Sequence, residues 1–234
     1  PEGDPHTKKA SAKRGLSSPQ TRLRNALWGE SESARLQAAL TAGTRPDDSY
    51  VAVLVERCGV EPDFFVRDML TWALTRHDRD LTVKIVLSEL HSPSSQARSQ
   101  ALHTLSKIGD PATGAAITVH HLHDDEVDVA RAAWRAAAGL VAHGREAELA
   151  QELVSELGRG DRETQRSLSR AFAMLGSAAA SAVEDAARGE TLAVSAHAMA
   201  TLAIIADPDH GFDAAIAEAR RVVALRGAPA VTEQ

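Results

Sequence analysis

The sequence has little of what several protein classes require. Its 234 residues include one cysteine, Cys58, and only 3% aromatic residues. A single cysteine forms neither an internal disulfide nor a cysteine-based zinc site, and it fits a reducing compartment. The sequence also has no apolar run of about 18 residues, which a transmembrane helix would need, and no signal-peptide pattern. We therefore expect a cytoplasmic protein with no membrane partner.

Alanine is the residue that the sequence has in excess, with 44 copies in a chain that is 44% hydrophobic. This composition is too apolar for a wholly disordered protein. Alanine is the best helix former, whereas the scarce aromatic residues favour strands. The composition therefore predicts an all-α protein.

Charge is distributed unevenly along the chain. Residues 1–24 contain six basic and two acidic residues, so that a segment of net charge +4 precedes a remainder of −10. The start of this segment is rich in Pro, Gly and Ser and lacks apolar periodicity. We predict a disordered basic arm or linker at 1–18, a folded region at 19–228 and a disordered tail at 229–234. The arm makes nucleic acid a candidate partner, although short basic segments also serve as solubilising linkers.

A repeat with a period of roughly 32 residues runs through the folded region, and such a period is typical of stacked helical repeats. Six segments share one register, in which apolar residues recur three, seven and ten positions after a reference position and therefore lie on one helix face. The reference positions are Arg35, Arg67, Arg98, Arg131, Gln165 and Ser195. A second helix is predicted before each of these, at 20–28, 47–58, 79–91, 111–122, 145–158 and 178–188, with a closing helix at 209–226. Such two-helix units bury their apolar faces only by stacking on one another.

Three consecutive motifs in the fourth unit resemble a HEAT repeat of the phycobilisome-lyase type. They are Ile108 to Pro111, Asp124 to Val127 and Val129 to Ala133. The resemblance covers about 20–226 and weakens where Gln165 and Ser195 replace the arginine. It implies a right-handed, armadillo-like α-solenoid of about six HEAT-like helix pairs plus a terminal helix.

The whole chain also resembles a group of bacterial HEAT-repeat proteins, some of which are fused to MerR-type DNA-binding domains. This second resemblance implies a role in transcription regulation. The sequence itself contains no helix-turn-helix pattern, so the chain would correspond to the part that does not bind DNA.

The column of arginines has two interpretations. HEAT arrays resemble a ladder in which an acid between helices binds the arginine of a neighbouring helix, and the candidate acids here are Asp63, Asp78, Asp80, Asp128 and Asp161. Alternatively, a row of guanidinium groups binds phosphates, since arginine suits bidentate contacts to oxyanions. The column follows the period of the fold, which favours the structural ladder.

The segment 64–74 contains apolar residues nearly all round the expected helix, which indicates either a covered helix or one that lines a groove. If the row that contains Trp72 and His103 faces the concave surface, these residues and Asp68 line a binding site there. The alternative is that the aromatic residues pack in the core. The candidate ligand- or partner-binding residues are Trp72, Asp68, His103, Arg98, Arg131, Trp134 and Arg135.

An enzymatic alternative comes from DNA alkylpurine glycosylases with HEAT-like repeats, which resemble this chain at the level of the fold and use Trp, Arg and Asp on a basic concave face. Against it, DNA affinity depends largely on basic side chains, and the folded region is strongly acidic. The sequence also contains no Walker, G-x-S-x-G or H-E-x-x-H motif. We therefore predict a non-enzymatic scaffold or sensor that binds a protein, a peptide or a small ligand on its concave face.

A run of three histidines and three acids, within 120–126, contains residue types that bind metals. It spans the end of one expected helix and the start of the next, where histidines and acids are explained by the helix dipole and by capping. Other histidines, such as His197, fit helix ends or the surface. We predict neither a metal site nor a cofactor.

Overall fold

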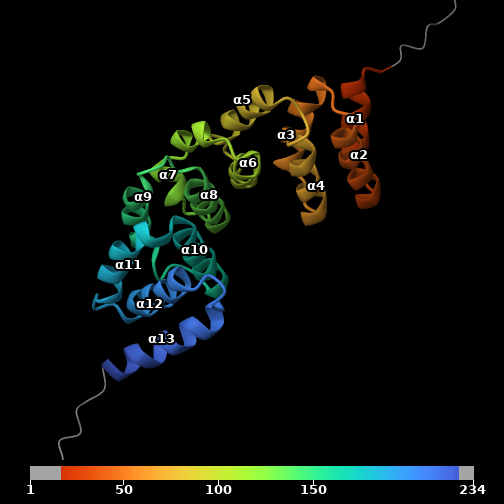
Figure 1. Cartoon of the computed structure of the whole chain (residues 1–234). Coiled ribbons are helices and arrows are strands. Elements are labelled where there is room, and N and C mark those ends of the chain that lie inside the picture. Colours follow the sequence, from red (N-terminus) through yellow and green to blue (C-terminus); the bar gives the residue numbers. More distant parts are fainter. Residues whose placement is uncertain (1–16, 227–234) are drawn as a thin grey trace, which may run out of the picture.

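The computed structural model describes residues 17–226, and these residues form an all-helical solenoid without strands (Figure 1). Nearly all of the predicted arm at 1–18 and the whole of the predicted tail at 229–234 lie outside this range. Pairs of helices follow one another along an arc, so the predicted all-α solenoid of helix pairs is confirmed.

Two layers of helices make up the arc, and each outer helix packs against the inner helix that follows it. The outer helices are α1 (Pro19–Leu27), α3 (Val51–Cys58), α5 (Arg79–Glu89), α7 (Val119–Leu122), α9 (Glu146–Leu153) and α11 (Ala180–Ala187). The inner helices are α2 (Glu32–Thr44), α4 (Phe64–Leu74), α6 (Ser95–Ile108), α8 (Val127–Leu140), α10 (Arg162–Leu175) and α12 (Leu192–Ala206). The last helix, α13 (Phe212–Arg226), packs along α12 and covers the end of the stack.

The inner helices begin at side chains that cap them. Asp63, Ser94 and Asp161 each accept a hydrogen bond from the backbone amide three residues later, which satisfies one of the free amides of the first turn. Asp63 and Asp161 were candidates for the arginine ladder, so the structure gives them a different role. The inner helix α6 ends at Gly109, whose φ of 70° lies in the left-handed region that favours glycine.

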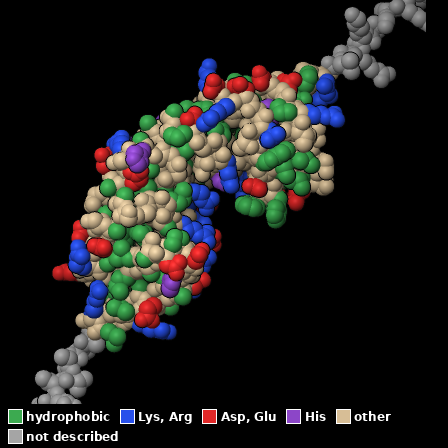
Figure 2. Space-filling view, in the orientation of Figure 1, with side chains coloured by type: hydrophobic (Ala, Val, Ile, Leu, Met, Phe, Trp, Pro, Cys, Tyr) green, Lys and Arg blue, Asp and Glu red, His purple; other side chains and the backbone are tan. Residues whose placement is uncertain are grey.

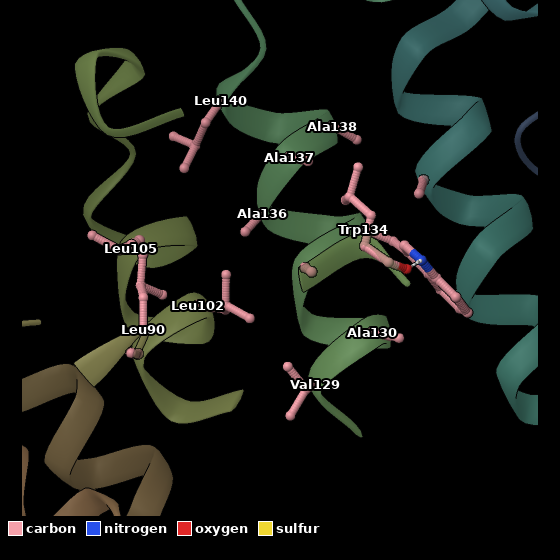
Figure 3. Close-up of a cluster of buried hydrophobic side chains, with 14 of the residues drawn as sticks. Leu90, Leu102, Leu105, Val129, Ala130, Trp134, Ala136, Ala137, Ala138 and Leu140 are labelled. Carbon is pink, nitrogen blue, oxygen red and sulfur yellow. Dashed lines mark hydrogen bonds between the residues drawn. The ribbon is translucent and has the colours of Figure 1, made fainter. Parts of the chain in front are cut away.

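The largest buried side chain is Trp134, in the core of the fourth pair. It is fully buried, and its Nε1–H donates a hydrogen bond to the Leu122 carbonyl oxygen over 2.8 Å. Figure 3 shows its ring on the side of α8 that faces α10, while Leu102 and Leu105 of α6 lie on the other side of α8. Trp134 is therefore a core residue and offers no surface to a ligand. Small side chains such as Ala136 let these helices approach closely.

The arginine ladder is present, but the acids that link successive repeats differ from those expected. Of the expected acids, Asp128 pairs with Arg131, at 3.8 Å and within the same helix. Arg35 binds Glu61 with an Nη2–Oε1 distance of 2.9 Å, and it donates to the carbonyl oxygens of Gly29 and Glu30. Each such arginine thereby ties the loop before its own helix to the loop of the next repeat.

Arg98 repeats the arrangement two helix pairs further on. It pairs with Asp124 at 3.2 Å and donates to the carbonyl oxygens of Ser92 and Pro93. In both cases the acid lies 26 residues after the arginine. Arg98, a predicted binding residue, is thus engaged within the scaffold.

Candidate functional site

A groove with a volume of about 690 Å³ opens on the inner face of the arc, between α4, α6 and α8. Lys and Arg side chains gather along this hollowed face (Figure 2). The charged residues that line the groove are Arg67 and Asp68 of α4, and Glu126, Asp128, Arg131 and Arg135 at the start and along the length of α8. The floor is formed by α6, which contributes Ser95, Gln96, Ser99, Gln100 and His103.

One wall of the groove depends on an interruption of the ladder at Arg67. At the position where the ladder would place an acid for Arg67, the sequence has Pro93, which cannot form an ion pair. Arg67 still ties down its own loop, because its Nη1 donates to the carbonyl oxygens of Glu61 and Pro62, both at 2.8 Å. Its other guanidinium nitrogens have no hydrogen-bond partner within residues 17–226, and the side chain lines the groove.

The opposite wall has a second interruption, at Arg131. The position of the corresponding ladder acid is occupied by Leu157, again not an acid. Here Arg159 reaches back from the next repeat, and its Nη2 donates to the carbonyl oxygen of Asp124. Arg131 makes no such bond to the loop before its helix. It instead forms ion pairs with Glu163 at 3.1 Å and with Asp128 of its own helix at 3.8 Å. The two arginines of the column that lack the usual acid are therefore the two that line the groove.

The histidine and acid run predicted at 120–126 serves the joint between the fourth and fifth pairs. His123 is held between Glu156, at 2.6 Å from Nδ1, and Glu152, at 2.7 Å from Nε2. Hydrogen bonds from these two carboxylates raise the pKa of His123. Glu156 also pairs with Arg159 at 2.7 Å. This network fixes the guanidinium of Arg159, which takes the place of Arg131 in the contacts to the loop before α8.

His103 lies on the floor, close to charged groups of both walls. Burial lowers the pKa of His103, the cations Lys107 and Arg135 lower it further, and Asp68 opposes them. The structure thus brings together four of the predicted site residues, Asp68, His103, Arg131 and Arg135, around one groove.

Trp72 lies elsewhere. Its ring packs against Gly43 of α2, where even one added carbon atom on Gly43 would collide with the ring. The side chain is 37% exposed but does not line the groove. At the rim, Phe64 supplies the exposed aromatic group instead: it is 64% exposed, and its ring packs edge-on against Phe65 with 5.6 Å between centroids.

Sequence reasoning missed Arg67 and Gln100 as groove residues. The available signal was the missing ladder acid after Arg67 and after Arg131, which only becomes visible once Glu61 and Asp124 are known to be the ladder acids.

The sequence matches no protein-family profile and no curated protein. Several solved helical-repeat structures are similar. An engineered protein shares 18% identity at a TM-score of 0.46, covering 90% of this chain and 98% of that one. Human deoxyhypusine hydroxylase, in complex with glycerol, shares 15% identity at a TM-score of 0.44, with coverage of 88% and 94%. The complex of CpcE and CpcF of phycocyanin lyase from Nostoc shares 14% identity at a TM-score of 0.37, with coverage of 94% and 100%. Among the helices between residues 17 and 226, none combines the length and apolarity needed to span a membrane.

Proposed function

We propose that this chain is a non-enzymatic binding scaffold that holds a peptide segment of a partner protein in the groove between α4, α6 and α8. The observation that carries the proposal is the release of Arg67 and Arg131 from the ladder on the two walls of this groove. Elsewhere the column neutralises its arginines, as Arg35 and Arg98 demonstrate. Arg67 has no ion pair within residues 17–226 and Arg131 is paired only with exposed acids, so both guanidinium groups are available to a ligand in the groove.

The chemistry of the lining favours a peptide over a small molecule. Pockets for small molecules are mostly apolar and bury most of the ligand, whereas this groove is open and lined mainly by charged and amide side chains. A peptide offers backbone groups to the side-chain amide of Gln100 on the floor and one side chain to Phe64 at the rim. Exposed aromatic groups are frequent anchors in protein interfaces.

A DNA-processing role has less support. Three acids, Asp68, Glu126 and Asp128, line the groove beside its three arginines, so the lining offers no net positive charge to a phosphate backbone. Trp134, one of the residues expected to face DNA, is fully buried. Ser99 is not paired with an imidazole that could activate it as a nucleophile, because its hydroxyl donates to the backbone oxygen of Asp128. A setting in transcription regulation is part of the proposal only through the resemblance to regulator-linked HEAT proteins.

The test is a selection from a displayed library of random peptides against the full chain. Two variants reverse one exposed positive charge each: Arg135→Glu in the groove and Lys84→Glu on the outer helix α5. We expect selected peptides to bind wild type and the Lys84 variant equally, and the Arg135 variant at least tenfold more weakly. Equal binding to both variants would place the peptide site elsewhere. Release of alkylated bases from methylated DNA by the wild-type chain would overturn the non-enzymatic role.

A further inference from the structure

We propose that the groove selects a peptide segment that carries an acidic residue, and that Arg131 and Arg135 hold its carboxylate. This inference rests on the proposed function and specifies its ligand. It comes from the way charge is distributed along the α8 wall of the groove.

The charges on the α8 wall are segregated. Both acids stand at the beginning of the helix, where Glu126 precedes it and Asp128 lies in its first turn. Arg131 and Arg135 follow further along, four residues apart and so on one face. The groove therefore has an acidic end near the start of α8 and a basic end deeper along it, although its total charge is balanced.

The arginines at the basic end are available to a ligand. Arg135 is exposed and takes part in no ion pair or side-chain hydrogen bond within residues 17–226. Arg131 pairs with Glu163 and with Asp128, whose side chains are 69% and 86% exposed, and surface ion pairs of this kind are weak enough to exchange. A ligand carboxylate can therefore bind Arg135 and compete with Glu163 for Arg131.

The floor of the groove adds a neutral donor at the same end. His103 of α6 lies close enough to Arg135 and Lys107 to be affected by their charges. An imidazole in this position stays uncharged near neutral pH and can donate one hydrogen bond to an oxyanion. An anion at this end thus meets two guanidinium groups and an N–H, which outweigh the single opposing charge of Asp68 on the α4 wall.

The probe is a peptide array whose members differ at one defined central residue. The central residue is Glu, Gln, Lys or phosphoserine, and the remaining positions are randomised. Fluorescently labelled full chain is applied as wild type, Arg135→Gln and the outer-surface control Lys84→Gln. Circular dichroism verifies that each variant is folded.

We expect wild type and the Lys84 variant to be retained at least tenfold more strongly by Glu than by Gln, and least by Lys, because a charge-assisted hydrogen bond is worth about that factor. The Arg135 variant should lose the preference. The phosphoserine arm tests the carboxylate itself: weaker retention than Glu supports it, and stronger retention would overturn it in favour of a phosphopeptide. Equal retention by Glu and Gln, with retention by both reduced in Arg135→Gln, would overturn the charge selectivity and leave the peptide-binding scaffold intact. No retention by any arm would overturn both.

Discussion

His197 should make the unfolding free energy fall in mild acid. The side chain is fully buried in α12, and burial lowers its pKa to about 4 from its ordinary value of 6.5. Its Nδ1 accepts a hydrogen bond from the Gly158 amide at 2.9 Å, so the proton of the neutral ring resides on Nε2, which faces the Gln165 carbonyl oxygen at 2.9 Å. A second proton on Nδ1 would face the Gly158 N–H and break this bond. The expected position at a helix end or on the surface is wrong for this histidine.

Proton linkage gives the direction and the size of this effect of pH on the unfolding free energy. As pH falls below 6.5, the unfolded chain takes up a proton at this residue while the folded chain does not, so folding becomes less favourable. The contribution of His197 is complete above pH 6.5 and is lost progressively as pH falls towards 4. At about 1.4 kcal/mol per pH unit, the gap between 6.5 and about 4 amounts to about 3 kcal/mol, and to about 2 kcal/mol at pH 5.

The assay is urea unfolding of wild type and His197→Gln at pH 7.5, 6.5, 5.5 and 5.0. Glutamine does not titrate, and its amide can accept from Gly158 and donate to Gln165. The variant should be less stable than wild type at pH 7.5, and the difference should shrink by about 2 kcal/mol at pH 5. Other titrating groups are common to both proteins and cancel in this difference. The same loss of unfolding free energy in both proteins would refute the reasoning.

Three further predictions concern individual contacts. The buried hydroxyl of Thr71 has no oxygen or nitrogen partner within residues 17–226 and only the weakly polar Cys58 thiol beside it, so Thr71→Val should raise the unfolding free energy by about 1 kcal/mol. Thr201→Val is its control and should lower it by a similar amount, since that hydroxyl donates to the His197 carbonyl oxygen at 2.8 Å. Gly43→Ala should destabilise by about 1–3 kcal/mol in thermal unfolding, because the methyl group meets the Trp72 ring; the usual gain of a helical Gly→Ala change would contradict that contact. The pKa of His123 is raised in the fold, so its stabilising contribution is complete below its ordinary pKa and is lost as pH rises through the raised value. A constant stability difference between wild type and His123→Gln across that range would contradict the hydrogen bonds of His123 to Glu152 and Glu156.

The inner layer of the fold was predictable because each of its helices has a strong apolar period. Leu70, Leu105 and Phe172, at the predicted core positions, are all fully buried. The outer layer was less predictable. The predicted helix at 111–122 is a 3-10 turn, Pro111–Ala116, followed by the short α7. Gly114 lies directly against the backbone of Leu140, and such a close approach between distant segments leaves no periodic signal in the local sequence.

The position of Trp72 shows why the site itself was only partly predictable. Trp72 and His103 occupy equivalent positions in successive repeats, yet one lies against α2 and the other on the groove floor. Periodicity determines which face of a helix a residue occupies. It does not determine how closely neighbouring helices pack, which depends here on a glycine, Gly43, far from Trp72 in sequence.

The arginines of the column fall into two groups, those that stabilise the scaffold and those that line the groove, and their shared helix position does not distinguish them. All four arginines occupy the same helix position, but Arg35 and Arg98 have an acid 26 residues later, and Arg67 and Arg131 do not. At Arg131, the carbonyl contacts that Arg98 makes for itself pass to Arg159. The two exceptions lie on either side of α6. Within residues 17–226 Arg67 has no ion pair, and Arg131 is paired only with the exposed acids Glu163 and Asp128, so both guanidinium groups that line the groove remain accessible to a ligand. We do not expect Leu157→Glu to restore the ladder. The side chain of Leu157 is buried beside α9, and a carboxylate there would first have to lose its hydration.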